Sequence, residues 1–165
     1  MPEIICHTTS LQYLHHLGLL DLLPRLATPV TVPQAVVDEL TVGRVRGLNL
    51  PDPSSLSWVT VRRPTGAPTM PLTPALGPGE MEVLALALAA TGAVAILDDL
   101  RARQMADKLG IRLRGTLGLL IDARRAGFIH AVAPLLEQLQ TGGFRLAPAT
   151  RLAILNLVGE IEPNR

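Results

Sequence analysis

The sequence predicts an α/β protein, a three-layer α/β/α sandwich around a mostly parallel central sheet. Two features of the sequence predict this fold. Short apolar runs alternate along the chain with longer segments whose apolar residues recur at helical spacing, and such runs are typical of strands that are buried on both faces. Polar residues directly follow several of these runs, as they do at the carboxyl ends of open parallel sheets, where ligands bind.

The expected elements cover most of the chain. The strands are residues 4–6, 29–32, 57–61, 93–97 and 111–114. The helices are residues 8–17, 19–26, 34–41, 78–91, 100–109, 116–125, 131–140 and 148–157. The pattern weakens between residues 42 and 78, where a Pro- and Thr-rich connection spans residues 62–74.

In the first half of the chain, local signals set the ends of these elements. Thr8 or Thr9 is expected to cap the first helix, and Gly18 is expected to end it, because hydroxyl residues favour the N-cap and glycine favours the end of a helix. Pro33 is expected at the first position of the third helix, which suits proline because that position needs no N–H donor.

The second half of the chain carries the same kind of signal. Glu80 and Glu82 are expected in the first turn of a helix that follows a Gly-Pro-Gly turn, where acidic side chains complement the helix dipole. Gly92 ends that helix and Gly110 ends the next one. Asp99 follows a strand and precedes a helix, which is a common place for an N-cap.

Length and composition predict one domain over residues 1–160, with residues 161–165 as a C-terminal tail. Hydrophobic residues make up 48% of the chain and aromatic residues 2%. The core must therefore be aliphatic, which disfavours sheets that bind single-stranded nucleic acid by aromatic stacking. The net charge of +1 disfavours a general polyanion binder, although 14 of the 15 basic residues are Arg, which suits local phosphate contacts.

Cysteine use and hydropathy predict a cytoplasmic protein. Cys6 is the single cysteine, so neither an intrachain disulfide nor a Cys-based zinc site can form. The most apolar run, residues 81–97, contains Glu82 and a Thr-Gly break and is short for a membrane span. We therefore expect no membrane segment.

The candidate site residues are the polar residues that follow strands and the acids near them. The first group is His7 to Thr9, Asp98, Asp99 and Thr116, and the acids are Glu39, Glu80, Glu82, Asp98 and Asp99. Two or three converging carboxylates can hold Mg²⁺, which prefers oxygen ligands. Residues 80 and 82 are about 200° apart around a helix, so they cannot both face one crevice. Structural roles stay open for each acid: first-turn charges, an N-cap at Asp99 and a solvated face for Glu39.

Five segments of the chain resemble the PIN-domain superfamily, the metal-dependent nuclease fold of the toxin ribonucleases of toxin–antitoxin pairs (VapC-like). The segments are IICHTTSLQYLHHLGLLDLLPRL, PQAVVDEL, LGPGEMEVLALALA, AVAILDDLRARQMADKLGI and RLRGTLGLLIDARRAGFI. Each is weak alone, but their order and spacing span nearly the whole chain. The chain looks closest to a poorly characterised prokaryotic branch of the superfamily.

This resemblance implies a set of site residues. The family's acids fall on Glu39, on Glu82 in preference to Glu80, and on Asp98 with Asp99 beside it. The family's hydroxyl positions fall on Thr8, Thr9 and Thr116. The family's first Asp, which follows the first strand, is His7 here. Three of the four acidic positions are therefore retained, and the first is lost.

His7 leaves three interpretations open. It can be a ligand in a nuclease with an altered metal preference, since imidazole nitrogen suits Mn²⁺ or Zn²⁺ better than Mg²⁺. It can be neutral to function, with Glu39, Glu82 and Asp98 holding the metal. It can also mark a degenerate site, because a histidine among acids is expected to be protonated and then to repel a cation.

The function that follows is hydrolysis of RNA with Mg²⁺ or Mn²⁺, with Thr9 or Thr116 orienting the attacking water. Arg101 and Arg103 are candidates for contacts with RNA phosphate. The alternative is a catalytically silent PIN module that binds nucleic acid or a protein. An antitoxin protein is a candidate partner, and so is a second copy of the chain. Such a homodimer would use the Leu14/Leu17 or Leu152/Leu155 faces.

Overall fold

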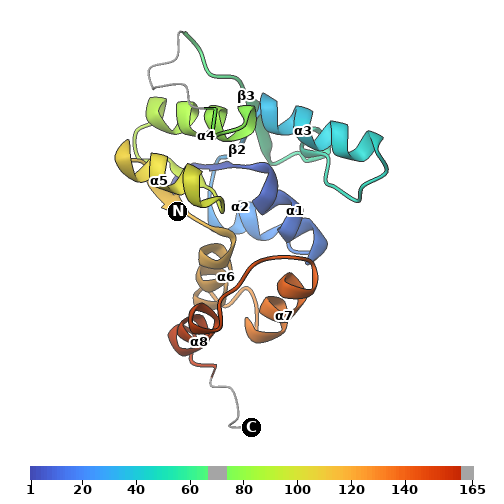
Figure 1. The fold of residues 1–165 in the computed structure, drawn as a ribbon, viewed down its shortest axis with the longest axis vertical. Helices are drawn as coiled ribbons and strands as arrows, with labels where there is room; N and C mark the ends of the chain where they lie inside the picture. Colours follow the sequence, from blue (N-terminus) through green and yellow to red (C-terminus); the bar gives the residue numbers. More distant parts are fainter. Residues whose placement is uncertain (67–73, 161–165) are drawn as a thin grey trace. The chain divides into compact units, whose positions relative to one another are not determined.

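The computed structural model describes residues 1–66 and 74–160 (Figure 1). Within them the chain forms a five-stranded sheet. The strands are β1 (Ile4–Cys6), β2 (Val30–Pro33), β3 (Val59–Arg62), β4 (Val94–Ile96) and β5 (Arg112–Arg114). Their order is β3-β2-β1-β4-β5, and each neighbouring pair is parallel. The prediction of an α/β fold with a parallel central sheet is confirmed.

Helices connect each strand to the next along the chain (Figure 1). They are α1 (Thr8–His16), α2 (Leu22–Leu26), α3 (Gln34–Val45), α4 (Pro78–Ala89) and α5 (Leu100–Lys108), with a 3₁₀ turn, η1, at Pro53–Ser55. The connections from β1 to β3 advance in one direction along the sheet, and those from β3 to β5 advance in the other. Right-handed connections that run in opposite directions place their helices on opposite faces. The result is a three-layer α/β/α sandwich.

The chain forms two compact units, Met1–Thr116 and Leu117–Arg165. The first holds the whole sheet. The second holds most of α6 (Thr116–Arg125), α7 (Ala133–Thr141) and α8 (Pro148–Leu157). In the second unit the Glu160 carboxylate accepts hydrogen bonds from the amides of Val132 and Ala133, at 2.7 and 2.8 Å. A single domain over residues 1–160 stays a prediction, and the predicted tail, 161–165, lies outside the described residues.

The core of the first unit is aliphatic, as the composition predicts. Strands β1 and β4 are buried along their whole length. Ile4 lies in register with Val30 on one side and Val94 on the other. Leu14 is fully buried inside this unit, and in the second unit Leu155 is 1% exposed. Neither of these two side chains is therefore available to a partner, whereas Leu152 is 55% exposed, and a homodimer stays a prediction.

The predicted starts of the first and third helices at residues 8 and 34 are right, but the roles given to Thr8, Thr9 and Pro33 there are wrong, for one physical reason. His7, and not Thr8 or Thr9, is the N-cap of α1, and Pro33 is the last residue of β2 and the N-cap of α3. In each case strand pairing extends further than expected, since the His7 amide donates to the Ile96 carbonyl at 3.2 Å and Pro33 pairs with Arg62. The helix therefore begins one residue after the last extended one.

Helix α3 is longer than predicted. It continues past Thr41 to Val45, because Val36, Leu40 and Gly43 keep one buried face at helical spacing. Gly43 does not end the helix, since its missing side chain leaves room for Leu50, with which a Cβ at residue 43 would collide.

Within residues 1–66 and 74–160, no helix combines the length and apolar character that a membrane span needs.

Candidate functional site at the carboxyl edge of the sheet

The candidate site lies where the order of the strands reverses. The chain leaves β1 toward β2 on one side and leaves β4 toward β5 on the other, so the crevice between β1 and β4 is the switch point of the sheet. Ligands of open parallel sheets bind at this point, outside the carboxyl ends of the strands. His7 directly follows β1, and Asp98 lies two residues after the end of β4.

Asp98 is held by three hydrogen-bond donors from two other segments. Its Oδ1 accepts from the Thr116 amide at 2.8 Å, and its Oδ2 accepts from the Thr116 hydroxyl at 2.6 Å and from the Ser10 hydroxyl at 3.2 Å. Thr116 and Ser10 are fully buried. Gly115 makes this approach possible, because a Cβ there would stand 2.9 Å from Asp98 Oδ1. The carboxylate is therefore fixed in one orientation.

Glu39 is held in a comparable way from the other side of α1. It projects from α3, and its Oε1 accepts from the Gly79 amide at 2.9 Å, in the first turn of α4. Its Oε2 accepts from the Thr8 hydroxyl at 2.5 Å. A carboxylate at a helix N-terminus is also stabilised by the helix dipole. The first turn of α1 thus links both acids, through Thr8 to Glu39 and through Ser10 to Asp98.

His7 lies beside Glu39 and is 8% exposed. Its Nε2 is 3.8 Å from Glu39 Oε2, and its Nδ1 is buried without a hydrogen-bond partner in the part of the chain that the structure describes. Burial lowers the pKa of His7 and outweighs the opposing effects of Glu80, Glu39, Asp98 and Asp99. The expectation that these acids keep His7 protonated is therefore wrong, and the ring is neutral at neutral pH.

The remaining acids hold helix N-termini. Glu80 accepts from the Gly77 amide at 3.1 Å, Glu82 accepts from the Ala35 amide at 2.9 Å, and Asp99 accepts from the Ala102 amide at 3.0 Å. Asp99 is thus the N-cap that the sequence predicts for α5.

Glu80 and Glu82 differ in whether their charge affects the pKa of His7. Glu80 is the acid with the largest effect on His7, whereas Glu82 is not among the groups that shift the pKa of His7. Glu80 therefore acts on the His7 imidazole together with Glu39, Asp98 and Asp99, and Glu82 accepts a hydrogen bond at the start of α3. The metal-binding roles of both acids stay predictions.

The other predicted residues lie around this group. Thr9 is half-buried in the first turn of α1, and Arg101 is exposed in the first turn of α5. Arg103 is half-buried, and its Nη1 donates to the Leu97 carbonyl at 2.9 Å. This bond ties α5 to the end of β4, which is a structural role for Arg103. Contact with RNA stays a prediction for both arginines.

Sequence reasoning missed Ser10, and it placed Gly79 and Gly115 in turns without predicting that they border the carboxylates. Ser10 is three residues after His7, so a helix that starts at His7 turns its hydroxyl toward the same end of the sheet. Tyr13 is one helical turn further along, and burial and the Asp98 charge raise its pKa. For Gly79 and Gly115 the sequence shows turn residues, and their proximity to Glu39 and Asp98 depends on the tertiary fold.

The donors of the site are suited to one kind of divalent metal binding and not to another. Among residues 1–66 and 74–160, no three His, Cys, Asp or Glu side chains are grouped so that they could hold one together. An all-protein cage therefore does not fit. Mg²⁺, however, is usually bound by one or two carboxylates and completed by waters and substrate phosphate. Glu39 Oε1 and Asp98 Oδ1 each accept one hydrogen bond from a backbone amide and keep a second lone pair. The donors present fit an ion of that kind.

Comparison with known proteins identifies a family. A family model described as a PIN domain matches residues 3–160, which is nearly the whole chain. No curated protein and no solved structure matches the chain.

Proposed function

Because the chain belongs to the PIN-domain family, whose members are generally nucleases, we propose that it is a divalent-metal-dependent ribonuclease. The reaction would be hydrolysis of RNA phosphodiester bonds with Mg²⁺ or Mn²⁺. The observation that carries the proposal is the pair of fixed carboxylates, Glu39 and Asp98, at the switch point of the sheet. Each is oriented by donors of its own chain before any substrate arrives, and such preorganisation favours catalysis.

The residues of the site take distinct roles in this proposal. Glu39 and Asp98 would hold the metal ion, with Glu80 and Asp99 adding negative charge nearby. When bound, the ion would supply charge stabilisation at the scissile phosphate and lower the pKa of water. The Thr116 hydroxyl is engaged with Asp98, so it orients that carboxylate, and Thr9 is the hydroxyl that remains a candidate for orienting water.

His7 decides the metal preference in this proposal. Burial lowers the pKa of its ring and so disfavours the cationic form that would repel a metal ion, and its Nε2 lies 3.8 Å from Glu39 Oε2. Nitrogen ligands favour Mn²⁺ and other transition metals over Mg²⁺. We therefore expect the wild-type protein to be more active with Mn²⁺ than with Mg²⁺.

The second candidate function is a PIN-fold module without catalysis, which binds nucleic acid or a protein partner such as an antitoxin. Two points favour it: the resemblance puts His7 where the family has its first acid, and no group of three metal-binding side chains is found in the described residues. A role as the toxin of a toxin–antitoxin pair is compatible with the first proposal and needs an adjacent partner gene.

Cleavage of a labelled single-stranded RNA with Mg²⁺ or Mn²⁺ tests both candidates. The variants are His7→Asp and Asp98→Asn, with Asp107→Asn as a matched control at an exposed acid of α5. Cleavage by wild type and Asp107→Asn, lost in Asp98→Asn, supports the ribonuclease. No cleavage by wild type, with activity appearing in His7→Asp, supports a scaffold that lost catalysis at residue 7. If folded wild type and His7→Asp are both inert, the ribonuclease proposal is wrong and the binding module replaces it.

A further inference from the structure

We propose that Gly79 is a positioning residue for Glu39. The backbone amide of Gly79 and the space left by its missing side chain would together form a seat for the Glu39 carboxylate at the start of α4. The inference rests on the proposed function where it assigns Glu39 to the active site. The seat itself is a structural statement that can be tested without any activity.

The distances around Gly79 leave no room for a side chain. A Cβ built on Gly79 would stand 2.6 Å from Glu39 Oε1, 2.7 Å from Oε2 and 2.9 Å from Cδ. All three contacts are closer than Cβ atoms approach other heavy atoms. The Gly79 amide donates to Oε1 at 2.9 Å, so the carboxylate lies against the backbone at the place where a side chain would be. Glycine is a default residue for such close approach.

The conformation of Gly79 does not explain its identity. Its φ is outside the left-handed region, whereas eight other glycines have positive φ. Gly79 is the second residue of a regular helix, where ordinary residues adopt the backbone conformation without strain. The requirement at residue 79 is therefore space for the carboxylate and not backbone freedom.

The backbone on the α4 side of the seat is anchored. Pro78 is the first residue of the helix, the Met81 amide donates to the Gly77 carbonyl at 3.1 Å, and the Glu80 side chain accepts from the Gly77 amide. A side chain at residue 79 would therefore displace Glu39. Glu39 would then also lose the Thr8 hydroxyl and its place beside His7.

Gly77 is a matched control for this test. It lies two residues earlier in the same Gly-Pro-Gly turn, its φ is −76°, and a Cβ built on it meets no heavy atom within 4 Å. Substitution by alanine at residue 77 changes the same chemical group in the same turn but leaves the carboxylate in place. A difference between the two variants therefore isolates the seat from the general effect of a glycine replacement.

The experiment compares Gly79→Ala and Gly77→Ala in RNA cleavage and adds Glu39→Asp alone and in the Gly79→Ala background. We expect Gly79→Ala to lower kcat by about 10–100-fold, with a smaller change in KM, as loss of a ligand's supporting partner does. Gly77→Ala should keep wild-type kcat. The shorter acid makes room for the new methyl group, so the loss in the double variant should be at least about threefold smaller than the product of the single losses.

A second measurement separates this inference from the proposed function. The amide proton resonance of Gly79, followed by NMR in wild type and Glu39→Gln, reports the hydrogen bond to the carboxylate without RNA, metal or a Gly79 variant. A downfield position in wild type that moves upfield in Glu39→Gln supports the seat even if the protein cleaves nothing. An unchanged Gly79 resonance overturns it, and so does a wild-type kcat in Gly79→Ala.

Discussion

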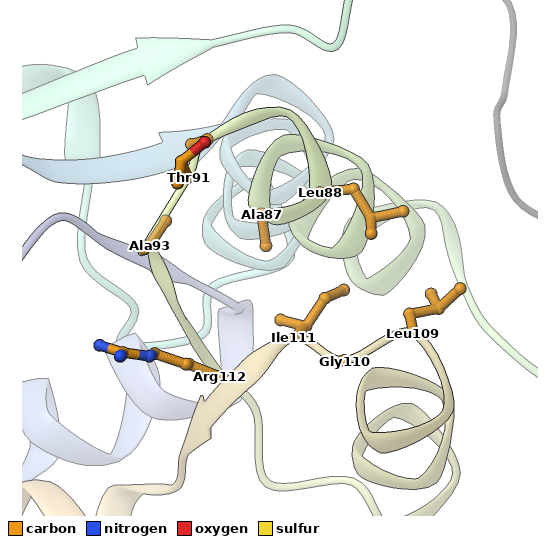
Figure 2. A pocket seen from close by; sticks show the side chains of 10 residues that line it. Ala87, Leu88, Thr91, Ala93, Leu109, Gly110, Ile111 and Arg112 are labelled. Atoms are coloured by element: carbon orange, nitrogen blue, oxygen red, sulfur yellow. The ribbon is translucent and has the colours of Figure 1, made fainter.

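The two edges of the sheet are built from different kinds of residue. At the carboxyl edge, Asp98 and Glu39 are each fixed by hydrogen bonds from buried or half-buried donors. At the amino edge, the turns that lead into β4 and β5 line a cavity of about 290 Å³ that opens to solvent (Figure 2). Its lining, all of it described, contains no carboxylate or imidazole. It consists of Ala87, Leu88, Ala90, Thr91, Gly92, Ala93, Leu109, Gly110, Ile111 and Arg112.

The cavity and the hydrogen-bonded carboxylates therefore lie at different edges of the sheet. A ligand site usually combines a concave surface with a few converging polar groups. The amino edge has the hollow, and its Leu109 and Leu88 side chains border it (Figure 2). The carboxyl edge has the converging groups, and their positions depend on glycines that bring backbone and carboxylate together. We infer that changes at the carboxyl edge act on activity and that changes at the amino edge act on stability alone.

The largest effect that would sharpen this comparison is expected from Thr116→Val. Valine keeps the volume of this fully buried residue but removes the hydroxyl that donates to Asp98 Oδ2 at 2.6 Å. Cleavage should fall by about 10–100-fold. The free energy of unfolding should fall by about 1.5–3 kcal/mol, the usual range for a hydrogen bond to a charged group. Steady-state cleavage and urea unfolding measure the two effects.

Thr116→Ser is the control, because it keeps the hydroxyl and loses a methyl group. Its cleavage rate should stay close to that of wild type, although its stability falls. If Thr116→Val and Thr116→Ser lose activity to the same extent, the hydroxyl does not position Asp98. That result would contradict the inference that hydrogen bonds at the carboxyl edge set the activity.

How far the sequence predicts this molecule depends on whether a feature is local. Apolar runs and capping signals predicted the sheet and the Asp99 cap of α5, because strand burial and capping are read over a few residues. The seat of Glu39 was not predicted, since it joins residues that are 40 positions apart. The prediction that His7 is protonated was wrong for the same reason. The sequence shows the acids that raise the pKa of His7, but it does not show the burial that outweighs them.

A moderate effect is expected at the amino edge from Gly92→Ala. Gly92 has a φ of +79° and a Cβ there would meet no heavy atom within 4 Å, so the cost is backbone strain without a collision. The free energy of unfolding should fall by about 1–2 kcal/mol, the penalty for an ordinary residue in the left-handed region. Gly92→Asn should lose less, since Asn tolerates this conformation. Cleavage by folded protein should not change, and a drop in kcat would contradict the separation of the two edges.

The smallest effect concerns pH and tests the carboxyl edge without RNA. Because burial lowers the pKa of His7 below its ordinary value of 6.5, the unfolded chain takes up a proton at this residue before the folded chain does. Stability should therefore be complete above about pH 6.5 and should decline as the pH falls below that value, since the unfolded state binds more protons there. The slope corresponds to the uptake of at most one proton.

Urea unfolding between pH 7.5 and about 5.5 measures this contribution. The range stays above the pH at which Glu160 titrates, since burial raises the pKa of its carboxyl group but hydrogen bonds from Ala133 and Val132 and the Arg124 charge outweigh it and lower the pKa below 4.5. His7→Gln should flatten the decline, whereas His130→Gln, at an exposed histidine, should leave it unchanged. A decline that persists in His7→Gln would show that His7 is not the group responsible. A rise in wild-type stability toward pH 5.5 would mean that the surrounding acids outweigh burial and that His7 is protonated in the folded protein.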